Sequence, residues 1–564
     1  MRANRLTHRL PTPFVLLVLG TLAAIVPASG PAAASTAMGS PAAEAIEHLL
    51  ATESPPVLDG GPIDPTELRR LYEARAWAPL WGGDGERAAA VVAVLRDAPS
   101  EGLDPATYHL GALAVPGDDT PQAMAGRDVL LTDAVIRYAT DVSLGRVAPR
   151  RNTQELELDP RQVDPVALAI SVAEAPDVRA AFAGLAPSRP EYARLRELLA
   201  RYRKIAARGA WPVVPDGEKL RPGVSDPAIP IVRRRLAASE ELTGAATASP
   251  LFDRPLASAV RAFQSRNGLS PDGVIGDGTR AALNRGVQQR IDQIVANMER
   301  WRWLPADFGQ RHVVVNIPAF ELALVDEGHV TLRMPVIVGR TERMTPVLSS
   351  RITDLVFNPF WRVPPTIASK DLLGKIRQDA SYFTGQSIHV YRKRDTGPVE
   401  LDPQEVNWRR LGDADLAQLR LRQEPGPTNP LGRVKFQMAN TLDIYLHDSP
   451  ARNLFQRPAR ALSSGCVRVG DALGLATALL QDMPDWTEER RATLLADWET
   501  HKVRLKNPVP VYLTYQTAWV DDGGAAHFRD DLYERDKRLT QSLQRRATRP
   551  GTSARRQGAA APTS

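Results

Sequence analysis

The spacing of apolar residues changes near residue 312, and this change constrains the fold more than any other feature of the chain. Before it, LRRLYEARAWAPLW (68–81) and DVLLTDAVIRYATDVSLG (128–145) follow the 3.6-residue period of a helix. After it, HVVVNIPAFELALVDEG (312–328) and VTLRMPVIVG (330–339) alternate with the period of two that is typical of strands. We therefore predict a multidomain α+β chain whose amino-terminal part is helical and whose carboxyl-terminal part is β-rich.

Pro and Gly clusters divide these two parts further. The 564 residues allow three or four domains of ordinary size. We predict a helical scaffold domain at 35–225, a small three-helix unit at 226–288, a connecting helix at 289–311 and a β-rich domain at 312–536. Few strand signals occur at about 366–428, which indicates an insertion within the β-rich domain.

The amino terminus has the three parts of a secretory signal. Three arginines before residue 10 make it basic, an apolar run of 13 residues follows at 14–26, and Ala32–Ala34 fits a small-residue cleavage site. A membrane span needs about 20 apolar residues. We therefore predict a cleaved signal peptide at 1–34, with an uncleaved anchor as the alternative. We expect the mature chain to have no membrane span and to lie in the periplasm or cell envelope.

Positive charge is concentrated at the carboxyl end. Residues 537–564 hold seven Lys and Arg residues and no acid, whereas the whole chain has a net charge of +6. The rest of the chain is therefore close to neutral, and we expect no nucleic-acid partner. Because the segment has almost nothing to bury, we predict a basic disordered tail.

Cys466 is the only cysteine in the sequence, which is unusual for an exported protein. It cannot form an intramolecular disulfide, and one thiol does not suggest a structural zinc site. An intermolecular bridge, a buried inert thiol and a catalytic nucleophile remain as alternatives.

The residues around Cys466 favour the nucleophile. Cys466 ends the turn SSGC (463–466), and a helical pattern occupies the second part of the following VRVGDALGLATALL. A helix amino terminus and a neighbouring histidine both lower a thiol pKa, and the backbone N–H groups of such a turn can hold an oxyanion. Among the nine histidines, His447 lies in a predicted strand, on the same face as Tyr445.

The segment PLASAVRAFQSRNGLSPDGVIGDGTRAALN (255–284) resembles the peptidoglycan-binding domain type 1. The resemblance covers about 60 residues at 226–288 and implies a three-helix wall-binding module, with a purely structural spacer as the alternative. The segment contains neither His nor Cys, so we expect no zinc site in it.

The stretches IYLHDSPARNLF (444–455) and RALSSGCVRV (460–469) resemble the L,D-transpeptidase catalytic domain of the YkuD family, and most closely its large YcbB-type branch. The stretches FNPFWRVPPTIASKDLL, PGPTNPLGRVKFQM and PVYLTYQTAWVDDG agree with that branch. The resemblance spans most of residues 40–536 in this domain order. It implies a YkuD-like catalytic domain in which the insertion at 366–428 caps the cleft.

The resemblance also implies a mechanism. Cys466 would attack the stem-peptide carbonyl between diaminopimelate and the terminal D-alanine, releasing D-alanine and leaving a thioester. The amine of a second diaminopimelate would then attack, which cross-links two stems. His447 would act as the base, oriented by the backbone carbonyl of Asp448. No cofactor is implied.

The remaining site residues follow from the same resemblance. Gly465, Cys466 and Tyr445 would form the oxyanion hole, and Ser464 and Arg468 would contact substrate. Arg468 either positions a stem carboxylate or braces the loop. Ser464 stands where many relatives have His.

Other functions stay open at this point. The same fold could act as a carboxypeptidase or amidase, or the chain could be a non-catalytic wall-binding scaffold. The expected partners are peptidoglycan stem peptides and glycan, with other cell-wall enzymes as further candidates. The family also implies that carbapenems acylate Cys466.

Overall fold

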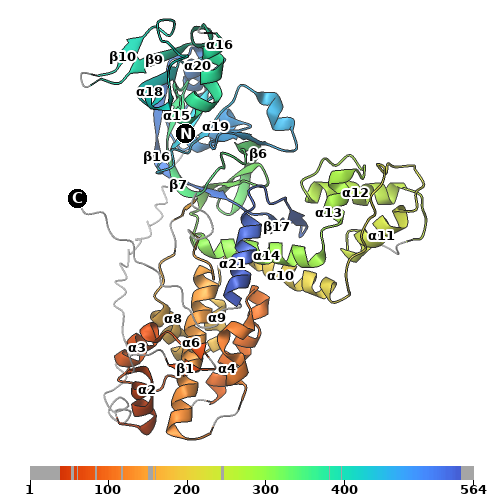
Figure 1. Cartoon of the computed structure of the whole chain (residues 1–564), viewed down its shortest axis with the longest axis vertical. Helices are drawn as coiled ribbons and strands as arrows, with labels where there is room; N and C mark the ends of the chain where they lie inside the picture. The colour runs from red at the N-terminus through yellow and green to blue at the C-terminus, as the bar shows by residue number, and fades with distance from the viewer. Residues whose placement is uncertain are drawn as a thin grey trace, which may run out of the picture.

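The computed structural model describes most of the chain (Figure 1). The ranges described are 39–51, 56–59, 61–82, 85–115, 118–149, 156–158, 161–242, 247–379, 381–394 and 397–547. The predicted signal peptide lies outside them. Within these ranges, no helix combines the length and the apolar character needed to cross a membrane.

The amino-terminal unit is helical, as predicted. Its main helices are α2 (Pro41–Ala51), α3 (Pro65–Ala74), α4 (Gly85–Arg96), α6 (Pro121–Leu144), α8 (Pro165–Glu174) and α9 (Val178–Ala183). Thr120 caps α6 by accepting a hydrogen bond from Ala123 N–H at 3.3 Å. Nearly every residue of α6 after Arg127 is buried, so α6 forms the centre of the unit.

A second, smaller unit contains α11 (Ile229–Ala238), α12 (Arg254–Arg266) and α13 (Asp277–Leu283) around its own apolar core. Gln264 fixes the turn between α12 and α13. Its amide donates to Asp272 at 2.8 Å and to the Val274 carbonyl at 2.9 Å, and its oxygen accepts from Gly273 N–H at 2.8 Å. The unit therefore has both an apolar core and a defined turn of its own.

Two helices join these units to the β-rich domain. Helix α10 (Pro190–Ala206) packs against α14 (Val287–Trp303), the predicted connecting helix. A shared core contains Tyr202, Trp301 and Phe308 together with Tyr512 from the sheet. The helical parts are therefore packed directly onto the β-rich domain (Figure 1).

The β-rich domain is built on one large mixed sheet, which confirms the α+β prediction. Its main strands are β4 (Arg311–Asn316), β5 (Glu321–Asp326), β6 (His329–Gly339), β7 (Val347–Phe357), β12 (Val434–Met438), β13 (Leu446–His447), β15 (Val467–Val469) and β16 (His501–Thr514). They run in the order β12-β13-β15-β6-β5-β4-β16-β7, and β12 also pairs with β7. That last pairing closes the path into a ring around an apolar core, against which α19 (Ala472–Leu480) packs.

The segment between β7 and β12 forms a separate layer, which we call the cap (residues 361–423). Its sheet has the order β10-β9-β11-β8, formed by β8 (Trp361–Arg362), β9 (Ile388–Arg392), β10 (Val399–Leu401) and β11 (Leu419–Gln423). Short helices, among them α16 (Leu373–Gln378) and α18 (Asp413–Ala417), cover this sheet, and the cap has an apolar core of its own. In Figure 1 the cap lies at the end of the molecule opposite the helical unit.

The prediction of a disordered tail from residue 537 is wrong for its first part. Residues Arg535–Ala547 form helix α21. Leu539 is fully buried and Leu543 nearly so, and both pack against Val147, Ala296 and Trp303. The tail looked unable to fold because it has few apolar residues, but these two leucines lie one helical turn apart and reach an existing apolar surface. Residues 548–564 lie outside the described ranges.

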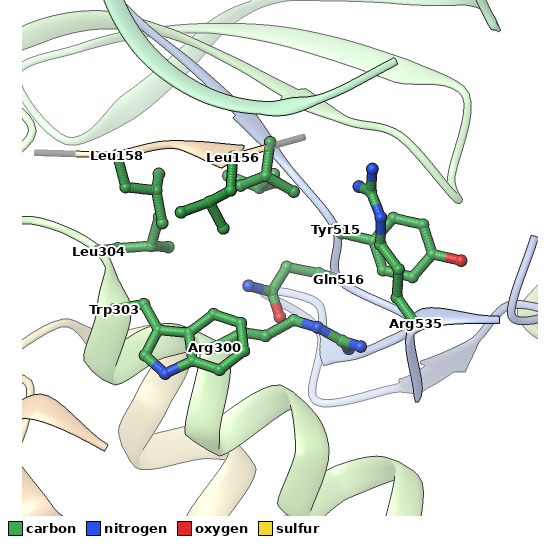
Figure 2. Close-up of a pocket in the computed structure, with 10 residues that line it drawn as sticks. Leu156, Leu158, Arg300, Trp303, Leu304, Tyr515, Gln516 and Arg535 are labelled. Carbon is green, nitrogen blue, oxygen red and sulfur yellow. The ribbon is translucent and has the colours of Figure 1, made fainter. Parts of the chain in front are cut away.

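The predicted helical scaffold also contains a strand. β3 (Leu156–Glu157) runs parallel to β7 in the large sheet, with Leu156 opposite Val347. Beside it, a cavity of about 20 Å³ lies between the helices and the sheet, lined in part by Leu156, Arg300 and Gln516 (Figure 2). Such a volume holds about one water molecule.

Candidate active site

The pairing of β13 with β15 brings the predicted site residues together. The strands are parallel, with Leu446 opposite Val467 and His447 opposite Arg468. Val467 N–H donates to the Tyr445 carbonyl at 3.2 Å, so Tyr445 lies beside Cys466. Leu446 and Val467 are fully buried in the core. Because side chains alternate along strands, the other residues share the opposite face: Tyr445, His447, Cys466 and Arg468.

His447 is held by the residue that follows it. Its Nδ1 lies 2.6 Å from the Asp448 carbonyl oxygen, which can only accept a hydrogen bond, so Nδ1 carries the proton and a neutral ring has Nε2 free of one. The ring is 5 % exposed. Burial, reinforced by the positive charge of Arg468, lowers the pKa of His447 to about 3. At neutral pH this imidazole is therefore uncharged.

The carboxylate of Asp448 binds two arginines, whereas its carbonyl orients His447. It accepts a hydrogen bond from Arg433 N–H at 2.8 Å and pairs with Arg452 at 2.6 Å. Asp448 N–H donates to the Val434 carbonyl at 2.9 Å. The residue is thus fixed on every side, which also fixes the carbonyl that orients His447.

The thiol of Cys466 is half-buried and protonated in this arrangement. Its Sγ lies 3.8 Å from the Asp443 carbonyl, a distance suited to an S–H donor. Burial raises the pKa of the Cys466 thiol, although hydrogen bonding by Tyr445 and the charge of Lys435 act in the opposite direction. At neutral pH the two pKa directions therefore favour a thiol on Cys466 and a neutral imidazole on His447 over a thiolate–imidazolium pair.

The helix predicted in the second part of VRVGDALGLATALL is present as α19 (Ala472–Leu480), but it does not begin at Cys466. The residue is followed by β15, and α19 begins only at Ala472, after its cap Asp471. The sequence VRV extends because Val467 and Val469 are fully buried between neighbouring strands. A helix dipole consequently does not lower the pKa of this thiol.

The turn before Cys466 leaves one backbone donor open. Gly465 N–H donates to Ser463 Oγ at 3.2 Å, and Ser463 Oγ donates to the Cys466 carbonyl at 2.6 Å. Cys466 N–H has no hydrogen-bond partner within the described ranges. Of the two backbone N–H groups predicted for the oxyanion hole, that of Gly465 is therefore already engaged and that of Cys466 is available.

Comparison with known proteins identifies the domain that holds this site. Residues 310–508 match the family described as the L,D-transpeptidase catalytic domain, YkuD. These residues form a YkuD-family L,D-transpeptidase catalytic domain. Residues 225–283 match a "Putative peptidoglycan binding domain", and residues 66–199 match a "Scaffold domain".

A curated relative of this chain comes from Haemophilus influenzae and is described as a "Putative L,D-transpeptidase". The two are 37 % identical over 247 residues, which cover 44 % of this chain and 48 % of the relative. The chain thus spans about half the length of the curated relative that it matches.

Two solved structures are also similar. One is an L,D-transpeptidase from Xylanimonas cellulosilytica, 17 % identical, covering 53 % of this chain and 99 % of that chain with a TM-score of 0.18. The other is the Ldtfm–avibactam carbamoyl enzyme, 10 % identical, covering 37 % of this chain and 51 % of that chain with a TM-score of 0.16.

The transpeptidase domain surrounds Cys466 with more cations than the sequence suggested. Lys435 on β12 lies opposite His447, with its Nζ 3.9 Å from the centre of the Tyr445 ring. In the sequence, Lys435 stands out only as a charged residue within the alternating strand VKFQM (434–438). Burial and the positive charge of Arg340 lower the pKa of Arg468, whose buried Nε has no hydrogen-bond partner in the described part of the chain.

Ser464 faces the cap and links it to the turn at 463–466. Its Oγ accepts from Arg343 at 2.9 Å, and the same guanidinium pairs with Asp371 of the cap, with one N–O distance of 3.0 Å. The hydroxyl is thus engaged with protein, and substrate contact by Ser464 stays a prediction.

One cluster within the described ranges could hold a cation. The ligand atoms of Asp497, Glu499 and His501 lie within 4.8 Å of one another, and both acids are exposed. Glu499 N–H already donates to the Asp497 carboxylate at 2.9 Å. The cluster contains none of the predicted catalytic residues.

Proposed function

We propose that this protein is a peptidoglycan L,D-transpeptidase that joins diaminopimelate residues of two stem peptides through a thioester on Cys466. The observation that carries the proposal is the β13–β15 register, which sets Cys466, His447, Tyr445 and Arg468 on one face of a YkuD-family domain.

In the first half-reaction, Cys466 Sγ attacks the carbonyl between diaminopimelate and D-alanine. His447 Nε2 takes the thiol proton as the S–C bond forms, which suits a neutral imidazole whose Nδ1–H is held by Asp448. The imidazolium then gives that proton to the departing D-alanine amine as the C–N bond breaks. A thioester and free D-alanine remain.

In the second half-reaction, the side-chain amine of another diaminopimelate attacks the thioester. His447 accepts a proton from this amine, the new amide bond forms, and the sulfur leaves and regains a proton. Each tetrahedral intermediate carries an oxyanion, for which Cys466 N–H is the open backbone donor. Tyr445 remains a candidate second donor through its hydroxyl.

The charge of the site suits an acidic donor peptide. The positive charge of Arg340 disfavours that of Arg468, and Lys435 lies over the ring of Tyr445. A stem tetrapeptide brings carboxylates that would neutralise these cations. The adjacent peptidoglycan-binding-like unit supports wall polymer as the substrate and the cell envelope as the location.

The test is to incubate the protein with disaccharide-tetrapeptide and to follow products by mass spectrometry, beside Cys466→Ala. We expect a dimer that lacks one D-alanine with the wild type and none with the variant. A tripeptide product alone would indicate a carboxypeptidase, and a folded protein that gives no Cys466-dependent product would favour a wall-binding scaffold.

A further inference from the structure

A hydrogen bond fixes the orientation of the peptide plane between Gly465 and Cys466. The Gly465 carbonyl accepts a hydrogen bond from Thr345 Oγ1 at 2.7 Å, and Thr345 is fully buried. In a planar trans peptide the C=O and N–H groups point opposite ways. Because the carbonyl points at buried Thr345, Cys466 N–H points away from it, and that N–H is the donor left open in the site.

Gly465 itself does not hold the peptide plane between Gly465 and Cys466 in this orientation. Gly465 has a φ of +119°, which glycine adopts without steric cost. The same freedom would let the peptide rotate, so its direction depends on the partner of the carbonyl. Thr345 is that partner, although 120 residues separate it from Gly465 in sequence.

The Thr345 hydroxyl can donate only toward Gly465. Its Oγ1 accepts from Gly339 N–H at 2.8 Å, which leaves its proton for the Gly465 carbonyl. The intervening loop folds back tightly, since a side chain on Gly339 would collide with the Arg343 carbonyl. The loop thus presents the hydroxyl from a fixed backbone.

Tyr533 lies beyond residue 508, where the matched catalytic domain ends, and it bonds both ends of the loop from Gly339 to Thr345. Its buried hydroxyl donates to the Gly339 carbonyl and accepts from Thr345 N–H at 3.3 Å. Arg535 lies over the Tyr533 ring and donates to the Thr345 carbonyl at 3.2 Å. Figure 2 shows Arg535 against Tyr515, with its guanidinium 5.0 Å from the centre of that ring.

We propose that Thr345, locked by Tyr533, is a positioning residue that aims Cys466 N–H at the oxyanion of the acyl-transfer reaction. The inference rests on the proposed function. It assigns to the segment after the matched domain, which ends at residue 508, a part in the active site.

The test separates two reactions of one thiol. Alkylation by iodoacetamide forms no oxyanion, whereas acylation by disaccharide-tetrapeptide or by a carbapenem does. Thr345→Val keeps the side-chain shape and removes the hydroxyl. We expect its acylation rate to fall about 10- to 100-fold, somewhat less than the loss seen when an oxyanion donor is deleted. Alkylation at pH 9 should stay within about twofold, because the lost donor acts on an oxyanion that this reaction lacks.

Two further variants guard against a merely structural effect. Thr345→Ser restores the hydroxyl and should recover most of the acylation rate. Thr341→Val removes an exposed threonine hydroxyl from the same loop and should acylate like the wild type. Equal losses of alkylation and acylation in Thr345→Val would overturn the proposal, because they would indicate a disordered loop.

Tyr533→Phe tests the lock. It should slow acylation by a smaller factor than Thr345→Val, with KM for the donor nearly unchanged. Combined with Thr345→Val it should add little, since both act on one peptide. Additive losses, or acylation by Thr345→Val at the wild-type rate, would refute the inference and leave the proposed function standing. A folded wild type that no donor acylates would refute both.

Discussion

The state of the resting thiol is the sharpest consequence of the geometry. Burial raises the pKa of Cys466 above its ordinary value of 9.0, and His447, with a pKa of about 3, carries no charge above pH 5. Because His447 is uncharged, no imidazolium is available to hold Cys466 as a thiolate. We therefore predict that the pH dependence of Cys466 alkylation lacks any histidine-linked step.

The expected slope of the alkylation rate against pH follows from the raised pKa of Cys466 and the lowered pKa of His447. A thiol with a pKa of 9 is about 1 % thiolate at pH 7, and a raised pKa makes the fraction smaller still. The alkylation rate should then increase about tenfold per pH unit from pH 6 to 9, because only the thiolate reacts. A pre-formed thiolate–imidazolium pair would instead react at a nearly constant rate across that range.

The chain itself makes the assay simple. Because the sequence has one cysteine, every iodoacetamide adduct seen by intact mass reports Cys466. Rates measured between pH 5 and 10 on folded protein give the profile directly. A plateau between pH 5 and 8 would refute our account of the thiol and would require His447 to be charged at rest.

Three further changes test other parts of the account. His447→Gln should slow donor acylation about 10²- to 10⁴-fold by removing the base, and an equal loss of alkylation at pH 9 would contradict that role. Lys435→Met should raise the thiol pKa further, because the ammonium favours the thiolate, and an unchanged alkylation rate at pH 8 would count against it. Leu539→Ala should destabilise the packing of α21 by about 2–5 kcal/mol, measured as a lower unfolding temperature than in the exposed control Gln541→Ala; equal temperatures would mean that α21 contributes nothing to stability.

The sequence predicted those features that depend on local periodicity. The change from helix to strand near His312 appears as β4 after the helix α14, and the alternation at Tyr445 and His447 correctly puts both side chains on one face. The pairing of that strand with the segment after Cys466 was not predicted. It depends on the burial of Val467 and Val469 within the sheet, so that a short strand separates the turn from the predicted helix, which forms as α19.

Residues that act from a distance could not be found in this way. Thr345 and Tyr533 lie 188 residues apart and meet only because the sheet closes and the chain returns to it. Lys435 gave a weak signal, as a cation in an alternating strand. Helix α21 was missed because two leucines are too few to predict a helix unless the surface that receives them is known.

The most direct test of the central claim is the mass of the enzyme during turnover. Wild-type protein is mixed with disaccharide-tetrapeptide, quenched in acid within a single turnover and weighed intact. Our account predicts an adduct equal to the donor minus D-alanine, removed by hydroxylamine as a thioester should be and absent from Cys466→Ala. Cross-linked product formed at the wild-type rate by Cys466→Ala, or an adduct that resists hydroxylamine, would contradict it.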